Sequence, residues 1–314
     1  MTLFLSEGDV ASLLDMKETV AAVEECFKRQ GSGEAANSPR TRTISPGAVF
    51  NVMHASLSYL GMAGVKCYLS SGRGTRFVFV LFRLDDAEPL AVMGADMLGR
   101  FRTGAASAVA TKHLFKSKDF EFAVCGSGKQ ALTQVRAMTE VASLRSVRVW
   151  SPRGERRESF AKELSKLGFD AVASASPSEA LSGAQVATAI TSSKDPFLTP
   201  DTVRPVKHLN LCGSNSPSRS EATPECVGEF QTVVVDDIGQ SKVEAGDLVG
   251  AQSEGFFSWG RAIELKEVVS GRIRPKGRTL FKSNGVAIED VAAARLVYEK
   301  AVKNGRYPER SLGF

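Results

Sequence analysis

Few of the residues that mark secreted, metal-binding or membrane-embedded proteins occur in this sequence of 314 residues. Its five cysteines are widely spaced, odd in number and never arranged as CxxC, which argues against a disulfide framework or a zinc knuckle. The three histidines are too isolated to predict a metal site. No apolar run approaches the roughly 18 residues of a membrane span, and the N-terminal segment lacks the features of a signal peptide. We therefore expect a cytoplasmic protein with reduced thiols, no bound metal and no membrane association.

The sequence also lacks a concentration of charge of one sign. Its 40 basic and 35 acidic residues are scattered along the chain, and the net charge is +5. This distribution is typical of a mixed solvated surface and argues against a nucleic-acid partner. The composition, 43% hydrophobic and 24% charged, is that of a folded protein, and the length suits two domains.

The first third of the chain predicts helices followed by a sheet. Apolar spacing within residues 6–30 favours one or two amphipathic helices, and 103–114 is an Ala-rich helical segment. In the polar stretch 31–47, Arg40 and Arg42 are two residues apart, so an extended backbone would direct both guanidiniums to one face. An antiparallel or mixed sheet is predicted from four strands, 49–53, 64–69, 77–84 and 89–93.

From residue 119 the pattern changes to alternating strands and helices. This alternation predicts a parallel sheet wound with helices. A final helix over 288–304 is expected to pack back on the first domain. The expected elements of the alternating region are strands at 120–125, 147–150, 186–190, 208–211 and 232–236, with helices at 129–142 and 155–167.

A glycine-rich segment follows the first of these strands. Residues 126–131 read G-S-G-K-Q-A, which fits the pattern G-x-G-x-x-A between a strand and a helix. Gly126 permits a tight turn, Gly128 lets a pyrophosphate approach the backbone, and Ala131 lets the helix pack closely on the strand. The helix N-terminus supplies N–H groups for the phosphates. The predicted cofactor-binding residues of this turn are Gly126, Ser127, Gly128, Lys129 and Gln130.

The end of the second strand indicates which dinucleotide binds. An acidic residue about 20 residues after the glycine turn would bind the adenosine ribose of NAD. Residues 149–153 read V-W-S-P-R and contain no carboxylate. Ser151 and Arg153, with Arg156 and Arg157 close by, instead form a cradle for a 2′-phosphate. We therefore expect NADP(H) to be preferred, with NAD(H) possible if these arginines only border a solvated helix.

Five short motifs follow one another along the chain: S-P-R-T at 38–41, G-V-K at 64–66, F-R-T-G-A-A at 101–106, G-S-G-K-Q at 126–130 and F-K-S-N-G-V-A-I-E-D at 281–290. Together and in this order they resemble the ornithine cyclodeaminase/mu-crystallin family over almost the whole chain. The resemblance implies an α/β protein that forms a homodimer. Its doubly wound Rossmann domain would span 119–286, and a discontinuous α+β domain for dimerisation and substrate binding would combine 1–118 with 287–314.

The resemblance also implies roles for charged and polar residues. Arg40, Lys66 and Arg102 would hold the carboxylate of a small anionic imino or amino acid, for which guanidinium and ammonium groups are natural partners. Arg42 is an alternative to Arg40, and Asn284 is a further candidate for substrate binding. The family's remaining cofactor contacts correspond to Arg102, Thr103, Thr191, Leu211 and Ser283.

One position departs from the family's cyclodeaminase pattern. Ornithine cyclodeaminase has a proton-transferring aspartate in the segment after the strand at 208–211, and Asn215 stands there in this sequence. An amide cannot accept a proton at physiological pH, so it cannot replace a general base. Imine reduction mainly requires orientation of the C=N carbon against a nicotinamide. The substitution therefore favours reduction over deaminative cyclisation, with Lys66 and Asn215 as the candidate catalytic residues.

The sequence thus predicts an NAD(P)H-dependent ketimine reductase that converts Δ1-pyrroline-2-carboxylate or Δ1-piperideine-2-carboxylate into proline or pipecolate. One alternative is an amino-acid enzyme similar to ornithine cyclodeaminase or alanine dehydrogenase. A non-catalytic NADP-binding protein is the other alternative.

Overall fold

The protein, described here by a computed structural model over residues 1–313, divides into two compact units. Residues 1–102 and those from 286 onward form the first unit, and Thr103–Gly285 form the second. The first division falls inside helix α3 (Asp96–Leu114), whereas the sequence placed it at residues 118 and 119. The expected α/β class, with one Rossmann-type parallel sheet and one discontinuous α+β part, is confirmed. The assignment of dimerisation and substrate binding to the first part stays a prediction.

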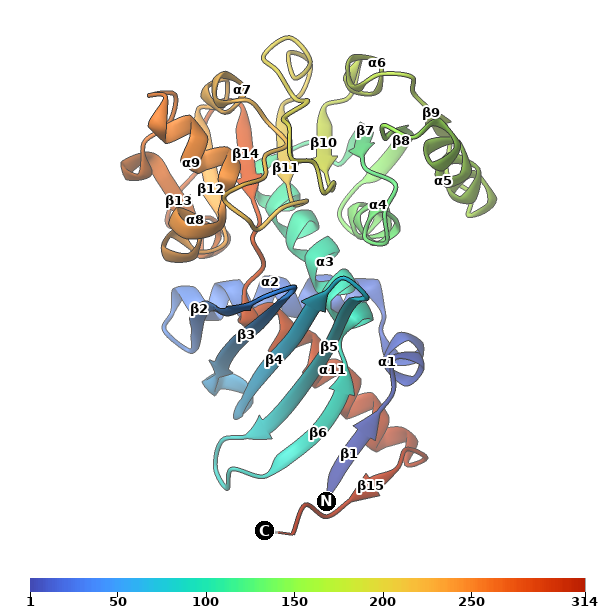
Figure 1. The fold of residues 1–314 in the computed structure, drawn as a ribbon, viewed down its shortest axis with the longest axis vertical. Helices are drawn as coiled ribbons and strands as arrows, with labels where there is room; N and C mark the ends of the chain where they lie inside the picture. The colour runs from blue at the N-terminus through green and yellow to red at the C-terminus, as the bar shows by residue number, and fades with distance from the viewer. Residues whose placement is uncertain (314) are drawn as a thin grey trace. The chain divides into compact units, whose positions relative to one another are not determined.

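The first unit contains a seven-stranded mixed sheet in the order β15-β1-β6-β5-β4-β3-β2 (Figure 1). Strands β2 to β6 pair antiparallel as successive neighbours, and β1 runs parallel to β6. The strands are β1 (Thr2–Leu5), β2 (Ala35–Ser45), β3 (Ala48–Leu57), β4 (Met62–Ser71), β5 (Gly74–Arg83), β6 (Pro89–Gly94) and β15 (Glu309–Arg310).

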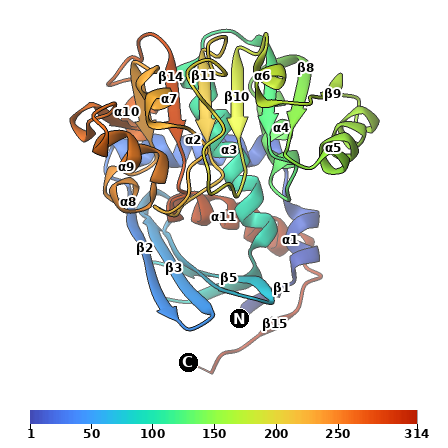
Figure 2. The ribbon, with the colours of Figure 1, turned by 45° about the horizontal axis from the view of Figure 1, so that its top comes forward.

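Helices cover one face of this sheet. They are α1 (Glu7–Leu13), α2 (Met16–Gly31) and α11 (Ala287–Asn304), and a 3-10 helix η1 spans Ser58–Leu60. Asp15 caps α2 by accepting a hydrogen bond from the N–H of Glu18 at 2.9 Å. Helix α11 lies along the sheet (Figure 2) and is followed by Gly305, which caps its C-terminus with a left-handed φ of 62°.

The opposite sheet face carries exposed apolar side chains. Phe50 pairs with Leu69 across β3 and β4, and Cys67, two residues from Leu69, pairs with Val78 on β5. Strand alternation therefore places Phe50, Leu69 and Val78 on one face. Their exposed fractions are 42%, 48% and 41%. By the same alternation, Lys66 of β4 points to the helix-covered face.

The second unit contains an eight-stranded sheet in which every pair of neighbours is parallel. From β7 the chain builds β8 and β9 on one side and then crosses to β10 on the other, which is the strand reversal of a Rossmann fold. In sheet order the strands are β13 (Ala262–Glu264), β12 (Thr232–Val235), β14 (Thr279–Lys282), β11 (His208–Leu211), β10 (Val186–Ala189), β7 (Asp119–Cys125), β8 (Ser143–Trp150) and β9 (Ala171–Ala173).

Helices surround this parallel sheet, as Figures 1 and 2 show. Buried β-branched and apolar residues fill strands inside this sheet, including all four residues of β12. None of the helices within residues 1–313 is long and apolar enough to cross a bilayer. Besides the end of α3, the helices of this unit are α4 (Ala131–Thr139), α5 (Gly154–Lys166), α6 (Pro177–Leu181), α7 (Pro224–Gly228), α8 (Ile238–Glu244), α9 (Gly246–Ser253), α10 (Leu265–Val269) and the 3-10 helix η2 (Trp259–Arg261).

Two predicted helices differ from those in the structure by more than one residue at an end. Helix α3 begins at Asp96 instead of residue 103, because the carboxylate of Glu7 accepts hydrogen bonds from the N–H groups of Asp96 and Met97 at 2.7 and 3.2 Å. A cap supplied from so far along the chain leaves no local sequence signal. Helix α4 spans Ala131–Thr139 rather than 129–142, and it begins later because the residues before it complete the glycine turn.

We predict that α3 and α4 require glycine at position 104. A Cβ there would lie 2.5 Å from the backbone oxygen of Thr133, so Gly104→Ala should lower the free energy of unfolding by about 1–3 kcal/mol. Gly99 on the same helix has open space around its Cβ position, and Gly99→Ala should raise it by about 0.5–1 kcal/mol. Urea unfolding of both variants measures the difference, and equal stabilities would contradict this account of the packing.

Candidate active site

The glycine turn joins the ends of three strands in the second unit. Gly126 follows β7 with a φ of +128°, which favours glycine. A Cβ at this position would overlap the carbonyl oxygen of Ile190, which follows β10. The N–H of Gly126 donates to the carbonyl oxygen of Trp150 at the end of β8 at 2.7 Å. The turn therefore holds the carboxyl ends of β7, β8 and β10 together.

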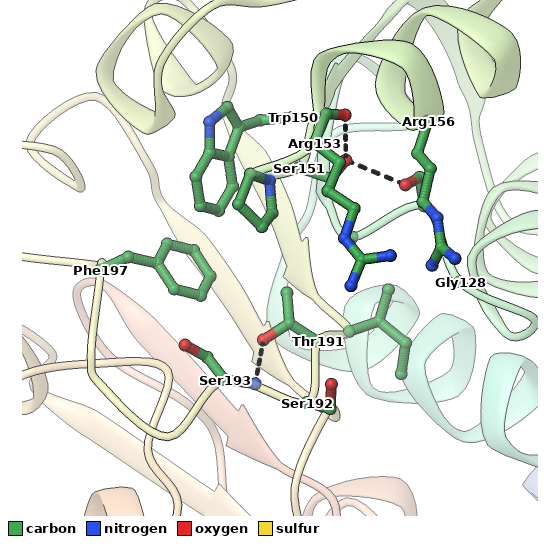
Figure 3. A pocket seen from close by; sticks show the side chains of 13 residues that line it. Gly128, Trp150, Ser151, Arg153, Arg156, Thr191, Ser192, Ser193 and Phe197 are labelled. Carbon is green, nitrogen blue, oxygen red and sulfur yellow. Dashed lines mark hydrogen bonds between the residues drawn. The ribbon is translucent and has the colours of Figure 1, made fainter.

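A pocket of about 310 Å³ opens at these strand ends (Figure 3). The hydroxyl of Ser127 donates to that of Ser151 at 2.9 Å, and both serines line the pocket. Gly128 is exposed, and its Cβ position has open space around it, so a ligand could reach the backbone there. Six of the predicted cofactor residues line this pocket: Gly126, Ser127, Gly128, Ser151, Arg153 and Thr191.

Other predicted cofactor residues lie outside the pocket lining. Lys129 and Gln130 are exposed in the turn before α4, and Leu211 is fully buried in the core of the unit. The hydroxyl of Ser283 is 3.4 Å from Asp236 Oδ2. Thr103 is buried on α3.

Sequence reasoning missed about half of the pocket. Residues directly after β8 and β10 could have been inferred, because the carboxyl ends of parallel strands meet at one edge. Phe197 lies in a loop well beyond β10 and has no such signal, although its ring packs against Trp150 with centroids 4.7 Å apart. Arg156, which the sequence placed beside the cradle for a 2′-phosphate, also lines the pocket, and the lining residues without a predicted role are Trp150, Pro152, Ile190, Ser192, Ser193 and Phe197.

The arginines after β8 differ in their placement. Arg153 and Arg156 line the pocket, whereas Arg157 donates to the carbonyl oxygen of Ser151 at 3.3 Å. Figure 3 shows Trp150 and Phe197 on one side and the side chains of Arg153 and Arg156 toward the other. The pocket thus combines an aromatic wall with two guanidiniums.

The first unit contains a buried cluster of cations and acids. Lys66 Nζ donates to both carboxylate oxygens of Asp290 at 2.7 and 2.6 Å. Arg102 Nε donates to Asp290 Oδ1 at 3.1 Å and its Nη1 to Glu289 Oε2 at 2.8 Å. Both acids belong to α11 and are completely buried. The paired acids stabilise cations that water no longer solvates.

Burial also changes the proton affinity of Lys66. Burial and, after it, the charge of Arg102 lower the pKa of this ammonium, while Asp290 acts in the opposite direction, and the resulting pKa is about 7. Lys66 can therefore exchange a proton near neutral pH.

The two arginines of β2 have different surroundings. Arg40 is buried with an exposed fraction of 9%, and its charge contributes to the lowered pKa of Lys66. Arg42 is partly exposed, and its Nε donates to Asn51 Oδ1 at 3.1 Å. Arg40, rather than Arg42, therefore belongs electrostatically to the cluster around Lys66.

The segment after β11 contains Asn215 beside a buried ion pair. Lys282 Nζ donates to Asp247 Oδ2 at 2.7 Å and to the carbonyl oxygen of Ser214 at 2.8 Å. Asn215 is partly exposed. Asn284 is buried, and its side chain donates to the Ser241 hydroxyl at 2.8 Å.

Comparison with known proteins identifies the family. Residues 1–305 match the ornithine cyclodeaminase/mu-crystallin family. The chain belongs to this family. The resemblance inferred from the five motifs is thereby confirmed.

Individual members of the family are similar over almost their full length. The chain is 32% identical over 313 residues to the alanine dehydrogenase of Archaeoglobus fulgidus, with 96% of this chain and 95% of that protein covered. It is 31% identical over 323 residues to a Δ1-pyrroline-2-carboxylate reductase of Bacillus cereus, with 96% and 98% covered. The structure of Thermococcus litoralis Δ1-pyrroline-2-carboxylate reductase in complex with NADH and L-proline matches with a TM-score of 0.91 at 30% identity, covering 98% of this chain and 100% of that chain.

Proposed function

We propose that this protein is an NAD(P)H-dependent reductase of a small cyclic imino acid. Its substrate is Δ1-pyrroline-2-carboxylate or Δ1-piperideine-2-carboxylate, and its product is proline or pipecolate. The buried cation cluster around Lys66 carries this proposal. The similar structure from Thermococcus litoralis, which holds NADH and L-proline, supports it.

The charges of the cluster suit a monocarboxylate. Three cations, Arg40, Lys66 and Arg102, are buried with two acids, Glu289 and Asp290. With Lys66 protonated, these five side chains have a net charge of +1, which one carboxylate neutralises. A planar carboxylate also matches the donor geometry of a guanidinium. We assign substrate binding to Arg40, Lys66 and Arg102.

Reduction requires a hydride for the imine carbon and a proton for the imine nitrogen. A bound nicotinamide dinucleotide supplies the hydride. We assign its binding to the pocket at the glycine turn, where the backbone at Gly128 is accessible and the N–H groups before α4 suit a pyrophosphate. Lys66, with a pKa of about 7, is suited to supplying or relaying the proton. Asn215 cannot act as the base that deaminative cyclisation requires.

Oxidative deamination of alanine is a second candidate. The 32% identity to an alanine dehydrogenase over 96% of this chain supports it. The two activities use the same hydride chemistry and the same carboxylate anchor, and they differ in the imino acid that is accepted. NADH formation from L-alanine and NAD⁺, without reduction of either cyclic imine, would favour this candidate.

We predict that the purified protein oxidises NADPH or NADH when Δ1-pyrroline-2-carboxylate or Δ1-piperideine-2-carboxylate is added. Lys66→Met should lower kcat/KM by about tenfold to a hundredfold, because it removes a charge-assisted contact to the carboxylate. The wild-type kcat/KM should fall as pH rises through about 7, since the ammonium form of Lys66 is then lost. Lys118→Met, at an exposed position, serves as the control. Absence of turnover on both imines would refute the proposal.

We further propose that NADP(H) is the preferred cofactor. Arg153 and Arg156 would bind its 2′-phosphate, together with the hydroxyl of Ser151. The double change Arg153→Met and Arg156→Met should lower kcat/KM for NADPH by about tenfold or more and leave the value for NADH nearly unchanged. Arg136→Met on the exposed side of α4 should alter neither. Equal losses with both cofactors would show that these arginines do not select the phosphate.

We also propose that the protein is a homodimer in which the apolar sheet face of Phe50, Leu69 and Val78 is covered by a second copy. A contiguous apolar sheet face of this kind is typical of an interface. Sedimentation should show a dimer, and Leu69→Glu should shift it to a monomer. Val243→Glu places the same charge at a residue of α8 that is 66% exposed and should leave the dimer intact. A monomeric wild-type protein would contradict the assignment.

A further inference from the structure

Glu221 is a completely buried carboxylate in the segment between β11 and α7. Its Oε1 accepts hydrogen bonds from the N–H of Thr191 at 2.7 Å and from the Thr191 hydroxyl at 2.8 Å. Its Oε2 accepts from the N–H of Gly213 at 2.9 Å. One side chain therefore joins the segment after β10 to the segment after β11.

The backbone of Glu221 holds a third segment. Its carbonyl oxygen accepts hydrogen bonds from the N–H groups of Phe197 and Leu198, each at 3.0 Å. Thr191 and Phe197 both line the pocket at the glycine turn, and Gly213 lies two residues before Asn215. Glu221 thus contacts two parts of the pocket wall and the base of the Asn215 segment, although it does not line the pocket itself.

Asp247 in turn fixes the backbone of Glu221. Asp247 Oδ1 accepts from the N–H groups of Glu221 and Ala222 at 2.6 and 3.0 Å, and Asp247 Oδ2 accepts from Lys282 at 2.7 Å. The space is tight on the other side as well, since a Cβ at Gly213 would overlap the backbone of Thr191 and the Glu221 carboxylate. The carboxylate therefore has little room to move to other hydrogen-bond partners.

We propose that Glu221 is a positioning residue for dinucleotide binding, because its carboxylate fixes Thr191 in the wall of the pocket. This inference rests on the proposed function, which places a nicotinamide dinucleotide there. The three groups that contact the carboxylate, the N–H and hydroxyl of Thr191 and the N–H of Gly213, are all hydrogen-bond donors. The ionised carboxylate can accept from all of them. An amide at position 221 would turn a donor toward one of these N–H groups and leave that group unsatisfied.

The ionisation of Glu221 is expected to respond to pH near neutrality. Burial and, after it, the charge of Asp247 raise its pKa, Lys282 and the Thr191 hydrogen bonds act in the opposite direction, and the resulting pKa is about 7. The titratable and charged groups that interact with it are Asp247 on α9, Lys282 on β14, Cys125 on β7 and Cys212 after β11. The carboxylate that binds Thr191 is therefore present above about pH 7 and is lost as pH falls through that value.

The sign for stability is the reverse. The folded-state pKa of Glu221 lies above the ordinary glutamate value of 4.5, so the folded state retains the proton longer than the unfolded chain does. Its contribution to stability is fully present below about pH 4.5 and is lost as pH rises to about 7. Cofactor binding and folding should therefore respond to this residue in opposite directions, which a merely structural role would not produce.

The test is calorimetric binding of NAD⁺ to the full-length protein, with the variants Glu221→Gln, Thr191→Val and Glu225→Gln. NAD⁺ is chosen because it has no group that titrates between about pH 6 and about pH 8. At about pH 8, Glu221→Gln should raise the Kd about tenfold or more, and Thr191→Val, which removes one of the three donors, should raise it less. Glu225→Gln makes the same chemical change at an exposed residue and should leave the Kd unchanged. Wild-type affinity should weaken between about pH 8 and about pH 6, and that of Glu221→Gln should not.

The outcomes separate this inference from the proposed function. If the wild-type protein binds NAD⁺ and Glu221→Gln binds it equally well at both pH values, the inference alone is overturned. If the wild-type protein binds neither NAD⁺ nor NADP⁺, the proposed function fails and the inference fails with it. If Glu221→Gln does not fold, the role of Glu221 is tested by the Kd of Thr191→Val and by the pH dependence of the wild-type Kd. A wild-type Kd that is independent of pH then overturns the inference.

Discussion

A charge removed from water must be matched by an opposite charge or by hydrogen bonds, and both units of this protein meet that requirement at their buried cations. In the first unit the acids of α11, Glu289 and Asp290, match Lys66 and Arg102. In the second unit Asp247 matches Lys282. Each unit therefore keeps cations at fixed positions without exposing them to solvent. Fixed cations bind an anion without first losing side-chain entropy, which favours the recognition of a small acid.

Burial explains most of the difference between the pKa of Lys66 and that of an ordinary lysine. Desolvation disfavours the ammonium and the charge of Arg102 disfavours it further, whereas Asp290, whose carboxylate Arg102 shares, stabilises it. The competition leaves the lysine near the midpoint of its titration at neutral pH. A carboxylate arriving beside it would shift the balance back toward the ammonium form. In the proposed reductase, substrate binding and protonation of Lys66 are therefore coupled.

Local sequence patterns predicted the glycine turn and the alternation of strands and helices, because each depends on residues close together in the chain. The strand around Lys66 was predicted in the same way. The structure adds features that depend on distant residues. Glu7 caps α3, Phe197 joins Trp150, and Glu221 holds Thr191. A lone acid or phenylalanine in a polar segment has no periodicity to indicate a partner, so such contacts could not be inferred. The motif at 281–290 was recognised, yet its pattern did not reveal that its two acids pair with Lys66 and Arg102.

The discontinuity of the first unit has a consequence for biosynthesis. Lys66 and its partner Asp290 are separated by 224 positions in the chain, and the whole second unit lies between them. During synthesis, the helix-covered face of strands β1 to β6 stays incomplete until α11 has left the ribosome. The parallel sheet of the second unit gains its last strand, β14, at Lys282, only a few residues before α11 begins at Ala287. The Lys66 cluster therefore cannot form until the whole second unit has been synthesised, and the helix that follows that unit completes the first one.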